Sequence, residues 1–333
     1  MQLIFNKTSG GGNKVKINGL PPAERLNLKE IETSVYRNDL IPIPVKKIIL
    51  KKGDTHYVLG MDFKLYKFKL GEEATQVCDK DMENIAYKLT YVDEKGALYT
   101  AITDKNQSYI EFYKIENGLL TLISQKGSSS FGRSAISPTK AFNLNSEFYF
   151  CTYNSNYKVH KSTDFGATLT DITSQIKLSD GARISYLDSL DFSFAKKAYS
   201  TKRIGSEPYD VEFYSFDGLN LKKYGIINNI SQEVIISDGF NIDDSEVFVM
   251  QKKSEFVESS IHHRTKYTYS LIKIEDNNST LKLNEYKTID RTTLYLWCGI
   301  YGIFAIDNNT VLYAEGEYSD NYIAFPVKTY ITE

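Results

Sequence analysis

Arginine is scarce in this chain, and its placement suggests chemistry with anions. Four of the seven arginines stand near the start of the first, third, fourth and sixth repeats of the chain: Arg37, Arg133, Arg183 and Arg291. Guanidinium groups hold carboxylates and phosphates through paired hydrogen bonds. If the repeats bring these positions to one end of the fold, the sequence predicts a pocket for an anionic ligand.

Glutamates at matching positions leave a second interpretation open. Glu83, Arg133, Arg183 and Glu233 follow one another at intervals of 50 residues. Ion pairs of Glu83 with Arg133, and of Arg183 with Glu233, would join neighbouring repeats without any catalysis. We favour these structural ion pairs over the anion pocket.

Two polar segments offer further binding residues. The long segment 251–267 contains His262, His263 and Arg264, and a shorter one contains Tyr153 and Tyr157. Adjacent residues on a strand point to opposite faces, so the two histidines alone are a poor metal chelator. The tyrosine rings are suited to stacking on a glycan or a protein surface, or they are solvated hairpin ends. We expect ligand contacts here, and no metal or other cofactor.

Known catalytic and cofactor motifs do not occur. The sequence has no Gly-x-Ser-x-Gly elbow, no P-loop and no His-Glu-x-x-His. Cys78, Cys151 and Cys298 are widely spaced and are predicted to be buried free thiols. The sequence therefore gives no positive indication of an enzyme.

The strands that are expected to position the candidate binding residues recur about every fifty residues. Six aromatic and β-branched runs recur at residues 56–59, 97–100, 148–151, 197–200, 247–250 and 311–314. A second run follows each of them, at residues 66–68, 113–115, 159–161, 214–216, 272–274 and 322–325. Short strands with this period are typical of propeller blades, because one blade cannot bury both of its faces alone. We predict an all-β, six-bladed β-propeller with about 45 to 55 residues per blade.

The third repeat contains a turn motif, Ser162-Thr-Asp164-Phe-Gly166-Ala-Thr168-Leu169. It resembles the Asp-box (BNR repeat) of sialidase-like propellers, Ser-x-Asp-x-Gly-x-Thr-Trp, with Leu169 in place of the usual tryptophan. The aspartate can accept backbone hydrogen bonds, the glycine permits positive φ, and the large apolar residue can pack between blades.

This resemblance has implications for function. It implies an arginine cluster that binds an anionic glycan, with a glutamate and a tyrosine available as base and nucleophile of a glycosidase. The sequence lacks the Arg-Ile-Pro signature of that family, and Arg183-Ile-Ser and Arg203-Ile-Gly come nearest to it. Catalytic roles are therefore not carried over to single residues.

The two ends of the chain predict its domain organisation. We expect residues 1–25 to form a docking arm and 26–333 the propeller, with a strand within 26–36 closing the last blade. Residues 5–12 and 16–19 are similar to the start of tail and baseplate proteins of phages and phage-tail-like particles. That resemblance implies contacts of the arm with other subunits of a larger assembly.

Composition limits the partners and the location. The 333 residues carry a net charge of −2, with 41% hydrophobic and 13% aromatic residues. The absence of a basic run disfavours nucleic acid, and no apolar run has the length of a signal peptide core or a membrane span. We expect a protein made in the cytoplasm, without membrane insertion, and incorporated into a virion or tail-like particle.

These observations favour one function and leave one alternative. The favoured function is a non-catalytic binding or structural module of a phage tail, baseplate or tail-like particle, in contact with other subunits or a cell-surface receptor. The alternative is a sialidase-like glycoside hydrolase or a lectin that binds an anionic glycan through the four arginines.

Overall fold

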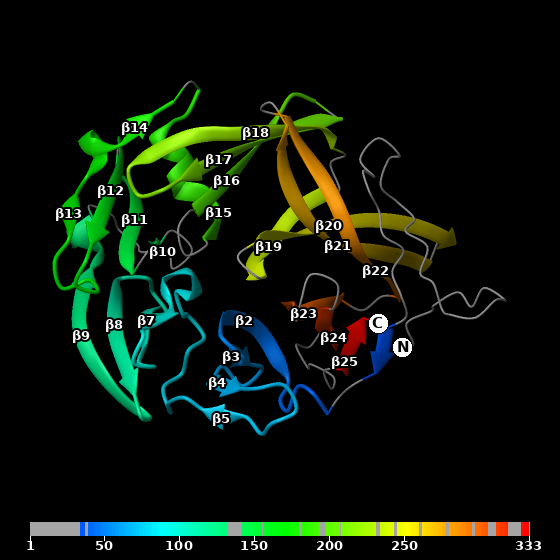
Figure 1. Ribbon diagram of the computed structural model, residues 1–333, viewed down its shortest axis with the longest axis horizontal. Coiled ribbons are helices and arrows are strands. Elements are labelled where there is room, and N and C mark those ends of the chain that lie inside the picture. Colours follow the sequence, from blue (N-terminus) through cyan, green and yellow to red (C-terminus); the bar gives the residue numbers. More distant parts are fainter. Residues whose placement is uncertain are drawn as a thin grey trace. The chain divides into compact units, whose positions relative to one another are not determined.

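The fold is all-β. The computed structural model describes residues 34–36, 39–131, 141–144, 146–154, 156–179, 181–193, 198–206, 208–230, 234–242, 245–259, 262–277, 280–294, 297–305, 311–318 and 328–332 (Figure 1). Side chains are described, with gaps, from residue 39 to residue 228. The chain divides into two compact units: unit 2 comprises residues 46–202 and 212–224, and unit 1 the remainder.

Four sets of strands follow one another along residues 45–230, and most of their residues belong to unit 2. The first sheet is β2 (Val45–Lys52), β3 (Thr55–Gly60), β4 (Leu65–Phe68) and β5 (Thr75–Gln76), and the second is β6 (Tyr91–Val92), β7 (Leu98–Thr103), β8 (Tyr109–Glu116) and β9 (Leu119–Gly127). The third sheet is β10 (Ala141–Leu144), β11 (Glu147–Asn154), β12 (Asn156–Ser162) and β13 (Thr170–Asp171). The fourth run of strands is β15 (Leu190–Ser193), β16 (Ala198–Ile204), β17 (Tyr209–Phe216) and β18 (Asn220–Ile230), with β14 (Lys177–Leu178) parallel to the start of β18.

Alternating side chains pack each sheet against the next. On β11, Phe148 and Phe150 belong to a core cluster shared with the second sheet, whereas Tyr149 and Cys151 belong to one shared with the fourth. The period of two along a strand separates these sets onto opposite faces. A third cluster joins Leu65 and other residues of the first sheet to the second. Consecutive four-stranded sheets packed face to face are a propeller arrangement, here with four blades.

Unit 1 contains longer strands. β19 (Val234–Ile242), β20 (Ser245–Ser259), β21 (His262–Asn277) and β22 (Thr280–Leu294) form an antiparallel meander. A separate sheet has the order β1 (Ser34–Tyr36), β25 (Lys328–Thr332), β24 (Val311–Tyr318) and β23 (Trp297–Ala305). In it Ser34 faces Thr332 across the strands, so a strand from the predicted closing segment 26–36 pairs with the C-terminal strand.

The count of six blades is not supported. The fourth and fifth repeats share one nine-stranded sheet, because β18 pairs in parallel with β22 through Ile226 and Thr280. The repeats themselves are real strands: the first runs of the six repeats lie largely in β3, β7, β11, β16, β20 and β24. The propeller arrangement is therefore present, and the correction concerns how many sheets the repeats form.

The turn at residues 162–169 is held by its own hydrogen bonds. Ser162 Oγ donates to Asp164 Oδ1 at 2.9 Å, and the Gly166 N–H donates to Ser162 Oγ at 2.8 Å. The Thr168 N–H donates to Asp164 Oδ1 at 2.8 Å. This backbone hydrogen bond is the main reason that the pKa of Asp164 lies below its ordinary value.

Phe165 makes the main packing contacts of that turn. Its side chain is buried and its φ is +52°. The ring lies against four aromatic rings of the second and third sheets: Tyr91, Tyr99, Phe112 and Phe148. Leu169 packs against the same cluster but is only partly buried, so Phe165, more than the terminal apolar residue of the motif, fills the space between the two sheets.

Two further expectations concern buried thiols and membranes. Cys78 and Cys151 are buried and form no disulfide, whereas the side chain of Cys298 lies outside the described part. Within the described ranges, no helix has the length and apolar character that crossing a bilayer requires.

Candidate functional site

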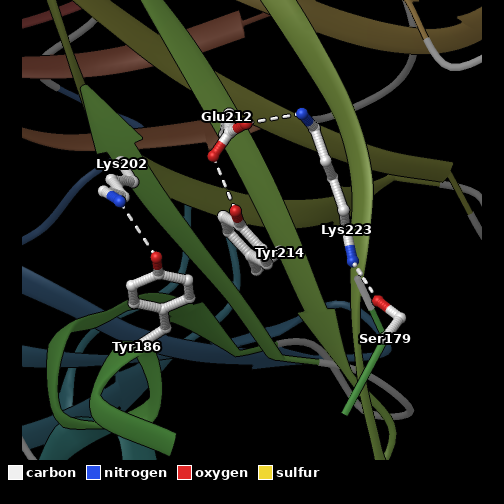
Figure 2. Close-up of polar contacts among 6 residues, drawn as sticks. All are labelled: Ser179, Tyr186, Lys202, Glu212, Tyr214 and Lys223. Atoms are coloured by element: carbon white, nitrogen blue, oxygen red, sulfur yellow. Dashed lines mark hydrogen bonds and ion pairs between the residues drawn. The ribbon is translucent and has the colours of Figure 1, made fainter. Parts of the chain in front are cut away.

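The most connected polar site of the described side chains lies in the fourth sheet. We call it the tyrosine–lysine cluster, and it comprises Tyr186, Lys202, Glu212, Tyr214 and Lys223 (Figure 2). Tyr186 comes from the 3-10 helix η6 (Ile184–Ser189), and the other four come from β16, β17 and β18. Glu212 and Tyr214 lie two residues apart on β17, so the pleat of the strand directs both side chains to the same face.

Hydrogen bonds and one contact between aromatic rings connect the cluster. The Tyr214 hydroxyl donates to Glu212 Oε2 at 2.6 Å, and Lys223 Nζ donates to Glu212 Oε1 (Figure 2). The Tyr186 and Tyr214 rings have centroids 4.5 Å apart. Lys202 Nζ donates to the Tyr186 hydroxyl at 2.9 Å. On β18 the backbone N–H of Lys223 donates to Ser179 Oγ at 3.1 Å, which ties the segment before η6 to the same strand.

The contacts within the cluster shift the pKa values of Glu212 and Tyr214 in opposite directions. Burial raises the pKa of Glu212, but the hydrogen bonds from Lys223 and Tyr214 outweigh it and hold this pKa below its ordinary value. Burial, followed by the hydrogen bond to Glu212, raises the pKa of Tyr214 above its ordinary value. At neutral pH the cluster therefore contains a carboxylate and a protonated phenol. An ionised Glu212 has no proton to give as a general acid, and a protonated Tyr214 is not a phenolate nucleophile.

The same triad occurs in two other sheets. In the third sheet Tyr149 donates to Glu147 at 2.8 Å, and Lys161 pairs with that carboxylate at 2.6 Å. In the second sheet, the carboxylate of Glu111 accepts hydrogen bonds from Tyr113 at 2.5 Å and from Lys80 at 3.1 Å. Recurrence in three sheets identifies the Glu–Tyr–Lys triad as part of the sheet architecture.

The cluster of the fourth sheet contains two residues in addition to its Glu–Tyr–Lys triad. The Tyr186 ring contacts the Tyr214 ring at an angle of 51° between the ring planes, and Lys202 is exposed and hydrogen-bonded to Tyr186. The sequence analysis singled out neither of them, nor the triads. A signal for the triads was available, because each contains the tripeptide Glu-Phe-Tyr, at residues 111–113, 147–149 and 212–214.

The predicted arginines are only partly described. Arg183 is exposed and directly precedes η6, where its carbonyl accepts a hydrogen bond from the Tyr186 N–H at 2.9 Å. Arg291 lies on β22 opposite Tyr267, and its side chain is outside the described part. Arg37, Arg133 and Glu233 also lie outside the described residues. The anion pocket and the Glu–Arg ion pairs both stay predictions.

The other predicted binding residues occupy separate places. Glu83 is exposed, and its N–H donates to Asp81 Oδ1 at 2.8 Å. His262, His263 and Arg264 begin β21, with His263 opposite Val257 and Arg264 opposite Phe256, but their side chains are not described. Over the side chains that are described, no group of three or more His, Cys, Asp or Glu residues could hold a metal ion.

Tyr153 and Tyr157 are brought together. They face each other across the β11–β12 hairpin, with ring centroids 4.7 Å apart and an angle of 46° between the ring planes. Tyr153 is 48% exposed, whereas Tyr157 packs against the core shared by the third and fourth sheets. An exposed ring is thus fixed on a regular hairpin.

Comparison with known proteins assigns no family. No family model and no curated protein matches the chain. Among solved structures it is similar to a putative oxidoreductase (glucose dehydrogenase) from Thermus thermophilus, with 8% identity over 90% of this chain and 99% of that one and a TM-score of 0.40. It is also similar to a functionally unknown protein from Desulfotomaculum acetoxidans, with 12% identity over 86% of both chains and a TM-score of 0.39.

A third similar structure is the WD40 β-propeller domain of Doa1. It shares 11% identity over 87% of this chain and 93% of that one, with a TM-score of 0.37. At such identities and TM-scores the likenesses carry no argument about this chain, and function has to be argued from its own residues.

Proposed function

We propose that this chain is a non-catalytic β-propeller binding or structural module. The observation that carries the proposal is the pairing of three partly buried carboxylates. Glu111, Glu147 and Glu212 each accept hydrogen bonds from a tyrosine two residues along the same strand and from a lysine. Carboxylates satisfied in this way stabilise the sheets and are not poised for proton transfer.

A comparison of two matched variants separates this proposal from the sialidase-like alternative. Glu212→Gln and Glu147→Gln each remove the carboxylate from an equivalent triad. Only Glu212 belongs to the cluster that also contains Tyr186 and Lys202. We expect neither variant to change the release of reducing sugar from sialylated and uronate-containing glycans, because the wild-type chain releases none. Turnover that Glu212→Gln abolishes and Glu147→Gln retains would establish a glycosidase and overturn the proposal.

We infer further that the module belongs to a phage tail, baseplate or tail-like particle and docks through residues 1–25. The support is the similarity of residues 5–12 and 16–19 to the start of such proteins. The predicted partners are other subunits of the particle, with a cell-surface receptor as a possible ligand of the exposed loops. Residues 1–25 themselves lie outside the described part.

Deletion of residues 1–25 tests the docking arm. The shortened chain retains Ser34–Tyr36, which pairs with the C-terminal strand, so we expect it to unfold at the same temperature as the full chain. We expect its incorporation into particles, followed by cosedimentation, to be lost. Normal incorporation of the shortened chain would refute the docking arm and leave the binding module itself in place.

A further inference from the structure

Tyr153 presents an aromatic face that the fold does not need for its core. Among the described side chains, it is the one aromatic residue in the group of exposed large hydrophobic residues. Glu147, Tyr149, Cys151 and Tyr153 lie on the same face of β11 by their spacing of two residues. Tyr149 and Cys151 are fully buried on that face, whereas Tyr153 extends beyond the core into solvent.

The ring is held in place before any ligand arrives. Tyr157 lies beside it on the paired strand and packs against the core cluster shared by the third and fourth sheets. A tyrosine has few rotatable bonds, so fixing its ring costs little entropy on binding. The geometry is that of a small, preformed stacking surface with a hydroxyl group at its edge.

A cation lies on the neighbouring fourth sheet, next to a residue that contacts the same core cluster. η6 packs against β11 and β12, and Tyr186 of η6 contacts the core cluster that Tyr157 contacts. Lys202 donates to the Tyr186 hydroxyl and is exposed. Lys80, Lys161 and Lys223 each form an ion pair with a carboxylate. Lys202 instead donates to a tyrosine, and its charge also helps to lower the pKa of Glu212. The exposed ammonium group keeps further N–H donors for an anion.

We propose that Tyr153, Tyr157 and Lys202 bind an acidic polysaccharide. The apolar face of a pyranose ring stacks on Tyr153, sugar hydroxyls hydrogen-bond to the tyrosine hydroxyls, and Lys202 pairs with a sugar carboxylate. The proposal rests on the binding function given above and names the class of its ligand.

Other classes of ligand fit less well. A stable protein interface buries about 800 Å² on each partner, and the residues around Tyr153 are polar, including exposed Asn156 and the ion pair of Lys158 with Asp171. Nucleic acid requires many cations along a backbone, and the chain has a net charge of −2. A single exposed ring with one cation matches a sugar carrying a carboxylate.

Binding of the full chain to a polysaccharide panel tests the proposal. The probes are polygalacturonate, alginate and polysialic acid, with neutral dextran for comparison, and the readout is the dissociation constant from titration calorimetry. We expect an acidic probe to bind and Tyr153→Ala to weaken it by about tenfold or more. Tyr153→Phe keeps the stacking face and should lose no more than about threefold. Leu122→Ala, at another exposed site, should change nothing.

A second variant tests the contribution of Lys202. We expect Lys202→Gln to remove the preference for acidic probes over dextran, together with the weakening of binding by added salt. Failure of all three acidic probes to bind the wild-type chain, or an unchanged affinity in Tyr153→Ala, would overturn the proposal. Either result would refute the glycan site only. It would not test particle assembly through residues 1–25 or the absence of turnover, so the proposed function is tested separately.

Discussion

Replacing Gly166 with alanine is expected to destabilise the protein by about 3 kcal/mol, the sum of a backbone and a packing contribution. Gly166 has a φ of +81°, where an L-residue with a Cβ is strained. A Cβ at this position would lie 2.6 Å from ring carbons of Phe112. Phe112 is fully buried and packs against the rings of Phe150 and Phe165, so it has little room to move. Urea unfolding followed by circular dichroism measures the loss.

Gly118 provides the matched control for this variant. Its φ of +79° is nearly the same, but a Cβ there would meet nothing within 4 Å. Gly118→Ala therefore reports the backbone contribution alone, about 1 kcal/mol. If the two alanine variants lowered the free energy of unfolding by the same amount, the clash with Phe112 would be excluded. The turn would then not pack tightly against the second sheet.

The period of the sequence predicts the strands well and the sheets less well. Phe148–Cys151 is expected to be a strand because three aromatic residues follow one another there, and it lies within β11. The strands of the fourth and fifth repeats were also expected, but their union in one sheet was not. A single parallel pair, Ile226 with Thr280, joins β18 to β22. Backbone pairing at a strand edge leaves no periodic signature in the side chains, so a repeat count cannot predict it.

The candidate site shows the same limit. Glu-Phe-Tyr is a local pattern in which phenylalanine and tyrosine turn to opposite faces of a strand, and its recurrence is visible in the sequence. Its lysine partners follow no fixed interval. Lys80 precedes Glu111 by 31 residues, whereas Lys223 follows Glu212 by 11. Lys161 and Lys223 lie on the strand that follows the strand of their glutamate, where the hairpin register selects them, whereas Lys80 comes from the segment before the second sheet. Neither the register nor that segment's position can be predicted from the tripeptide.

The packing role of the turn at residues 162–169 leads to the second large effect. Phe165→Ala is expected to lower the free energy of unfolding by about 4 kcal/mol. The lost ring is buried and lies 4.3 Å from the Phe148 ring and 5.1 Å from the Tyr99 ring between centroids, both in edge-to-face geometry. The substitution would leave a cavity between the second and third sheets. The rings around it are packed by both sheets, so they have little freedom to fill it. Urea unfolding again gives the measurement, and Leu122→Ala on the exposed surface should leave it unchanged.

The backbone of Phe165 adds a test that separates ring packing from strain. Its φ of +52° is unfavourable for any residue with a Cβ. Phe165→Gly removes the ring just as Phe165→Ala does, but it also relieves this strain. Because glycine adopts positive φ freely, we expect the glycine variant to be more stable than the alanine variant by about 1 kcal/mol, the reverse of their usual order in a regular strand. If alanine were the more stable replacement, positive φ at Phe165 would not be a feature of the folded protein. The turn would then have to hold its ring between the sheets by a different backbone path.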